Sequence, residues 1–207
     1  MRTFFINAFK KTIILLVIAS FALPAFARHE NPAQHIQAGD DALAAGNYAM
    51  AISQYSQAIR SDKSNPLGYQ KRAFVEMQQQ KYLDVIRDAS KVLKIMPTDS
   101  ESLSLRAYSY DSRSQYKKEM KDVEALLKLD CGVRNLLWHA RLAERFSAPQ
   151  QVIDDCNQAI NLGLGRDELA QLYKLRAGAY KKLGKKKESE QELAKYESLT
   201  PLAPQAP

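Results

Sequence analysis

The chain has 207 residues, a formal net charge of +7 and 45% hydrophobic residues, with only eight glycines and eight prolines. This length allows one ordinary domain or a short repeat array, and the composition excludes a largely disordered chain. β-Branched residues are sparse after residue 30 and no alternating strand pattern is present, which indicates a mostly helical protein. The positive excess is mild and gives little support for nucleic-acid binding.

Residues 1–27 have the pattern of a secretory signal peptide. Three cations precede an apolar run from Thr12 to Leu23, and small residues at positions 25 and 27 precede the predicted cleavage site. Removal of these three cations would lower the net charge from +7 to +4. We predict an exported protein, periplasmic or secreted, with no transmembrane span in the mature chain. The alternative is an uncleaved membrane anchor, for which the run is short, since a spanning helix needs about 20 apolar residues.

From about residue 32 onward, a pattern of small and aromatic residues returns at a spacing of 34 residues. The first copy contains Gly39, Gly46, Tyr48, Ala51, Ile52, Tyr55, Ala58 and Ile59; the second contains Ala73, Gln80, Tyr82, Val85, Ile86, Ala89, Val92 and Leu93; the third contains Ala107, Ser114, Tyr116, Met120, Val123, Leu126 and Leu127. A unit of this length with small residues at regular places is typical of a helix pair that stacks on copies of itself.

Local signals divide the array, residues 32–199, into five predicted units, at about 32–65, 66–99, 100–132, 133–169 and 170–199. In the second unit, helices are predicted from Leu67 to Gln79 and from Tyr82 to Ile95. Pro66 suits the first position of a helix, and Pro97 stops the helix before it. The proline-rich tail, residues 200–207, is predicted to be disordered or extended.

The repeated places resemble the tetratricopeptide repeat (TPR) family, most clearly from Gly46 to Ile52 and from Tyr55 to Ile59. The resemblance covers about residues 32–201. It implies an all-α fold, a right-handed superhelix of about five helix pairs, and binding of other proteins rather than catalysis. Glu119 departs from the pattern, because the family has Ala there, and the third helix pair is expected to be shifted or splayed at that point.

In such superhelices the first helix of each pair lines the concave face. The family's inward positions imply a partner-binding groove made of Ile36, Asp40, Leu43, Gln70, Phe74, Met77, Tyr108, Asp111, Leu137, Arg141, Arg145, Lys174 and Lys181. This groove would be apolar and aromatic in its N-terminal half and basic in its C-terminal half, which suits a peptide with an apolar stretch and an acidic end. The alternative is that Phe74 and Met77 complete the core between units.

The two cysteines, Cys131 and Cys156, form a possible disulfide in an oxidising compartment. The alternative is that Cys156 is buried and packs as a small hydrophobic side chain. The three histidines are scattered without metal-ligand spacing, and no phosphate-binding loop or nucleophile motif is present in the sequence. We therefore expect no enzyme activity, no metal and no cofactor.

Together these patterns predict a non-enzymatic adaptor of the cell envelope that binds a protein or peptide. Two alternatives remain open. The chain could be a structural subunit of an envelope assembly that uses its edges and convex face. It could also bind anionic lipid or glycan through the lysine-rich stretch from Lys181 to Lys187.

Overall fold

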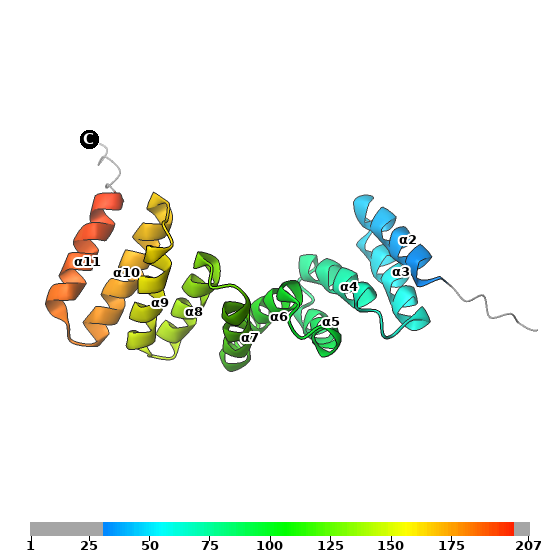
Figure 1. Ribbon diagram of the computed structural model, residues 1–207. Helices are drawn as coiled ribbons and strands as arrows, with labels where there is room; N and C mark the ends of the chain where they lie inside the picture. Colours follow the sequence, from blue (N-terminus) through cyan, green and yellow to red (C-terminus); the bar gives the residue numbers. More distant parts are fainter. Residues whose placement is uncertain (1–30, 201–207) are drawn as a thin grey trace, which may run out of the picture. The chain divides into compact units, whose positions relative to one another are not determined.

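The computed structural model describes residues 31–200, which form ten α-helices and no strand (Figure 1). The predicted signal peptide and almost all of the predicted tail lie outside these described residues. Within the described range, no helix combines the length and the apolar character that a membrane crossing requires.

The helices follow one another as five hairpins. They are α2 (Pro32–Ala44), α3 (Tyr48–Ser61), α4 (Pro66–Gln78), α5 (Tyr82–Ile95), α6 (Ser100–Ser112), α7 (Tyr116–Leu129), α8 (Val133–Arg145), α9 (Pro149–Asn161), α10 (Arg166–Lys182) and α11 (Lys186–Leu199). The first hairpin belongs to one compact unit, which ends at Asn65, and the other four hairpins form a second unit from Pro66 onward. The predicted all-α class and the number of helix pairs are confirmed.

Helix starts are set by local chemistry. The side chain of Asn47 accepts a hydrogen bond from the Met50 amide at the start of α3, and Asp99 does the same for the Ser102 amide of α6. Such caps satisfy amides that have no partner inside the helix. Pro66 occupies the first position of α4, where no amide hydrogen is required.

The turn inside each hairpin contains a residue in the left-handed backbone region. Glycine occupies this place in the first and fifth hairpins, whereas the three middle hairpins have a side chain there. These residues are Gly46, Gln80, Ser114, Ser147 and Gly184, with φ between 56° and 73°. Because only glycine adopts this region at little cost, the middle hairpins hold their turns in a strained conformation.

Small residues allow the two helices of a hairpin to approach closely. At Gly39, even a Cβ atom would overlap the aromatic ring of Tyr55, which is fully buried on α3. In the second unit the equivalent places are alanines exposed by at most 2%: Ala73, Ala107, Ala140 and Ala177. Successive hairpins of this unit also pack on one another, α5 on α6, α7 on α8 and α9 on α10. Its largest core cluster joins α8, α9 and α10 around Leu136, Cys156 and Leu172.

A charged clip recurs in all four hairpins of the second unit. A basic side chain on the first helix pairs with a buried acid 16 residues later on the second helix. The pairs are Arg72–Asp88 at 2.6 Å, Arg106–Asp122 at 2.6 Å, His139–Asp155 at 2.7 Å and Arg176–Glu192. The acids are at most 5% exposed, so each buried carboxylate needs its basic partner to offset the cost of its burial.

Two of these cations also contact the preceding hairpin. Arg106 donates to Ser90 Oγ at 3.1 Å, and Arg176 donates to Asn157 Oδ1 at 2.6 Å. These contacts join neighbouring repeats as well as the two helices of one repeat. This clip was not predicted from the sequence, although its 16-residue spacing recurs every 33 to 37 residues along the chain.

Candidate functional site

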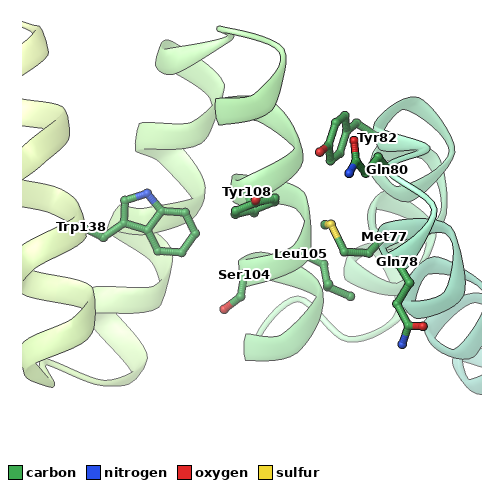
Figure 2. Close-up of a pocket in the computed structure, with 8 residues that line it drawn as sticks. All are labelled: Met77, Gln78, Gln80, Tyr82, Ser104, Leu105, Tyr108 and Trp138. Carbon is green, nitrogen blue, oxygen red and sulfur yellow. The ribbon is translucent and has the colours of Figure 1, made fainter.

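Two pockets between the first helices of the second unit contain residues of the predicted groove. The aromatic pocket has a volume of about 480 Å³ and lies chiefly between α4 and α6, with one wall from α8. It is lined by Met77, Gln78, Gln80, Tyr82, Ser104, Leu105, Tyr108 and Trp138. None of these side chains is charged. Figure 2 shows the Tyr108 ring between Trp138 on one side and Met77 on the other.

Part of the aromatic surface in this pocket is not buried in the core. Tyr108 is 52% exposed, although its neighbour Ala107 on α6 is completely buried. The rings of Tyr82 and Tyr108 lie 6.4 Å apart between centroids at an angle of 56°, a favourable tilted arrangement. The pocket therefore offers aromatic faces and edges that an incoming apolar group can cover.

Trp138 is held in place by a buried carboxylate. Its indole Nε1 donates to Glu119 Oε1 at 2.6 Å, and Glu119 is 1% exposed on α7. Burial raises the pKa of Glu119, and the bond from Trp138 acts in the opposite direction. Glu119 is the residue that departs from the repeat pattern, so the departure positions the indole that forms the wall of the aromatic pocket.

The third helix pair is not splayed at Glu119 as expected, because α6 and α7 pack together as the helices of the other hairpins do. The wider gap lies between two successive hairpins instead. Within the described part of the chain, α4 contacts α6 and α8 contacts α10 directly, whereas α6 and α8 make no such direct contact. Trp138 lines the aromatic pocket and also a neighbouring pocket between α6 and α8. The large indole thus occupies the wider gap between these two first helices.

The basic pocket lies between α8 and α10 and has a volume of about 490 Å³. It is lined by Leu137, Arg141, Glu144, Arg145, Gln171, Lys174 and Leu175. Three of these side chains are cationic and one is acidic. The pocket therefore has an excess of positive charge, in contrast with the uncharged aromatic pocket.

The cations of the basic pocket have few anionic partners. Arg141 donates to the neutral Gln171 at 2.8 Å, and Lys174 lies 5.5 Å from the centroid of the Tyr196 ring. Arg145 lies over the ring of Tyr116 at 4.4 Å and reaches an Asp111 oxygen only at 3.7 Å. Among the described residues, no carboxylate lies within ion-pair distance of Arg141 or Lys174.

The structure places the predicted groove residues in different surroundings. Met77 and Tyr108 line the aromatic pocket, and Leu137, Arg141, Arg145 and Lys174 line the basic pocket, with Asp111 beside Arg145. Gln70 donates to Asp99, Phe74 is 41% exposed on α4 outside both pockets, and Lys181 is exposed near the end of α10. Ile36, Asp40 and Leu43 belong to the first unit, where Asp40 accepts the Tyr55 hydroxyl at 2.7 Å.

Two aromatic residues of this pocket, Tyr82 and Trp138, are not among the groove residues predicted from the sequence. Tyr82 begins a second helix, and Trp138 reaches the aromatic pocket from a later hairpin. The groove was predicted from the inward positions of the first helices, and neither residue occupies one of these positions. Only the packing of three hairpins brings them to the same cavity.

The possible disulfide is not formed, which corrects the prediction for Cys131 and Cys156. Both thiols are free: Cys131 is exposed after α7, whereas Cys156 is completely buried in the middle of α9. Burial raises the pKa of the Cys156 thiol to about 12. The alternative, a buried cysteine that packs as a small hydrophobic side chain, describes Cys156. Across residues 31–200, no cluster of three or more potential ligands is arranged to hold a metal ion.

Comparison with known proteins identifies the fold. No protein-family model matches the sequence. The chain is similar to the crystal structure of MamA, with a TM-score of 0.70 and 14% identity, covering 85% of this chain and 98% of MamA. It is also similar to YrrB, a TPR protein with an unusual peptide-binding site, with a TM-score of 0.74, 12% identity, and coverage of 85% and 90%.

A curated relative matches part of the chain. Sperm-associated antigen 1 of Mus musculus is 28% identical over 114 residues, which are 51% of this chain. The match spans only 12% of that protein's length. These similarities and the repeated hairpins define the class: the chain has the fold of the TPR proteins, and the resemblance predicted from the sequence is confirmed.

Proposed function

We propose that this protein is a non-enzymatic interaction module that binds a peptide or protein segment across the first helices of its second unit. The single observation that carries the proposal is the aromatic pocket, where Tyr108 is half exposed and no charged side chain is present. Exposed aromatic residues in a cavity are frequent energetic anchors at protein interfaces. YrrB, a TPR protein of the same fold, has a peptide-binding site, and this similarity supports peptide binding here.

The charges suggest the chemistry of the bound segment. An uncharged aromatic pocket on α4 and α6 is followed by a basic pocket on α8 and α10. An apolar group suits the first pocket, and a carboxylate suits Arg141 and Lys174 in the second. The ligand would therefore combine an apolar stretch with an acidic end.

The proposed setting is the cell envelope or the exterior. Its support is the N-terminal pattern of cations, apolar run and small residues, which is typical of export signals. The mass of the protein purified from its native host tests this proposal. A chain that begins at Arg28 supports export, whereas a cytoplasmic chain that retains residues 1–27 would contradict it.

The binding function is tested by a double substitution in the aromatic pocket. Met77→Ala with Tyr108→Ala removes apolar surface that is partly or largely exposed, so the fold should persist. In cross-linking from native cells, we expect this variant to lose the partners that the native chain captures. Leu83→Ala is the matched control, since Leu83 is 61% exposed on α5 and lies outside both pockets. An unchanged set of partners in the double variant would overturn the proposal.

A further inference from the structure

We propose that the bound segment is extended, and that it carries an aromatic side chain and an acidic side chain about six residues apart. This inference rests on the proposed function and adds a conformation and a spacing to it. It follows from the relative positions of the aromatic pocket and the basic pocket, which belong to the same compact unit.

The two pockets occupy equivalent places in the repeat. Residues 77 and 78 of α4 correspond to 144 and 145 of α8, and Ser104 and Leu105 of α6 correspond to Lys174 and Leu175 of α10. In each case the pocket lies between the first helices of two successive hairpins, which contact each other directly. The two pockets therefore open on the same side of the first-helix layer, where one ligand can reach both.

The separation of the pockets sets the length of the ligand. Packed helices lie about 8–10 Å apart, and two such steps separate the gap between α4 and α6 from the gap between α8 and α10. Because α6 and α8 make no direct contact, the step between them is longer than a packed one, and the distance is at least about 20 Å. An extended chain covers about 3.3 Å per residue and spans this distance in about six residues, whereas a helix would need about 13.

The aromatic pocket fits a ring better than a small aliphatic group. Its volume is about 480 Å³, and Tyr82 and Tyr108 already lie in a tilted arrangement that a third ring can extend. Gln80 and Ser104 add polar groups at its edge, which can bond to the backbone of an extended segment.

The basic pocket fits a carboxylate. The bond from Arg141 to Gln171 uses one N–H group of the guanidinium and leaves its charge uncompensated. Gly178 stands at the place that Tyr108 occupies in the aromatic pocket, so no ring fills this place, and Glu144 Oε1 lies 3.8 Å from where a Cβ would stand. Glu144 limits the positive charge, which favours one or two carboxylates over a dense polyanion or a lipid surface.

Trp138 provides a direct measurement of binding. It is the only tryptophan of the chain, and it lines the aromatic pocket. The experiment titrates the full chain with synthetic peptides that contain one Phe and an Asp-Asp pair, separated by two, six or twelve Ser and Gly residues. Trp138 fluorescence reports binding, because the peptides contain no tryptophan.

We expect the peptide with the six-residue spacing to bind at least tenfold more tightly than the peptides with the other two spacings. Arg141→Gln should weaken this peptide about tenfold and should abolish the preference for Asp-Asp over Asn-Asn. Arg113→Gln is the matched control, because Arg113 is exposed at the end of α6 and lines neither pocket. This variant should bind the peptide with the same affinity as the native chain.

Three outcomes would overturn the inference: equal affinity at all spacings, an optimum at twelve residues, or binding to anionic vesicles that Arg141→Gln removes. Each of them leaves the proposed function intact if the Met77 and Tyr108 double variant still loses its native partners. If no peptide binds and that double variant also keeps every partner, the proposed function fails together with the inference.

Discussion

Glu76 lies on α4 with 4% of its surface exposed, and its Oε2 atom has no hydrogen-bond partner. Its other oxygen is 3.7 Å from Arg87 and 3.9 Å from Arg72, which is too long for strong compensation. Burial, together with the nearby charge of Asp88, raises the pKa of Glu76 to about 7. Because the folded pKa lies above the usual value, this group stabilises the fold fully only below about pH 4.5. The contribution is lost as the pH rises through about 7.

We therefore expect Glu76→Gln to be more stable than the native chain at pH 8, by up to about 3 kcal/mol, and to show little gain at pH 5. Urea denaturation at the two pH values measures this difference. Glu101→Gln serves as the control, since Glu101 is exposed in the first turn of α6, so its loss should change stability by less than about 1 kcal/mol and similarly at both pH values. A Glu76→Gln chain that is less stable than the native chain at pH 8 would contradict the argument.

His139 is the only histidine among the cations of the charged clip. The bond from its Nδ1 atom to Asp155 raises the pKa of His139, and burial acts against this rise. The other charge facing it is Glu124, on α7, while Asp155 also accepts from Gln151. The charged imidazole therefore stabilises the fold below about pH 6.5, and this contribution is lost as the pH rises through the raised pKa.

Asp155→Asn should lower the pKa of His139 to its usual range or below, because burial then acts with little opposition. An NMR titration of the His139 ring in both chains measures the shift. Asp154→Asn is a matched control on the same helix, since Asp154 is exposed and bonds to Gln150 instead. If the His139 ring titrates identically in the native and Asp155→Asn chains, the bond to Asp155 is not the cause of the raised pKa.

At the scale of the element, substitutions of the left-handed turn residues should have opposite effects on stability in two hairpins. Gly184→Ala should destabilise the protein by about 1 kcal/mol, because alanine is strained at a φ of 73° and nothing nearby contacts the new Cβ. Ser147→Gly should be neutral or slightly stabilising, because it relieves strain at a φ of 56°. Thermal unfolding of both variants measures the two effects. Destabilisation of similar size in both would show that backbone strain is not the cause.

At the scale of the whole molecule, the order and limits of the helices could be predicted from the sequence, because their signals are local. The helix predicted from Tyr82 to Ile95 has these bounds in the structure, and the predicted start at Leu67 differs from Pro66 by one residue. Prolines, caps and small residues at a regular spacing act within a few residues of where they stand.

The candidate site was predicted only in part, because it depends on packing between hairpins. Tyr108 and Arg141 were predicted from their places on first helices, whereas Trp138 reaches the aromatic pocket across the gap between α6 and α8. The possible disulfide failed for a related reason: the sequence shows how many residues separate the two thiols, but not that Cys156 faces the core.

The two free thiols differ so much in exposure that their reactivity can measure how fast the helices around α9 open. Cys131 is open to solvent, whereas Cys156 is fully buried, and burial raises the pKa of its thiol to about 12. An alkylating reagent reacts with the thiolate, which is the nucleophile, so it should modify Cys131 at once and Cys156 only when α9 separates from its neighbours. The slow phase, followed by mass spectrometry, would give the opening rate of these repeats, and Cys131→Ser should abolish only the fast phase. Equal labelling rates at both positions would contradict a closed core around α9.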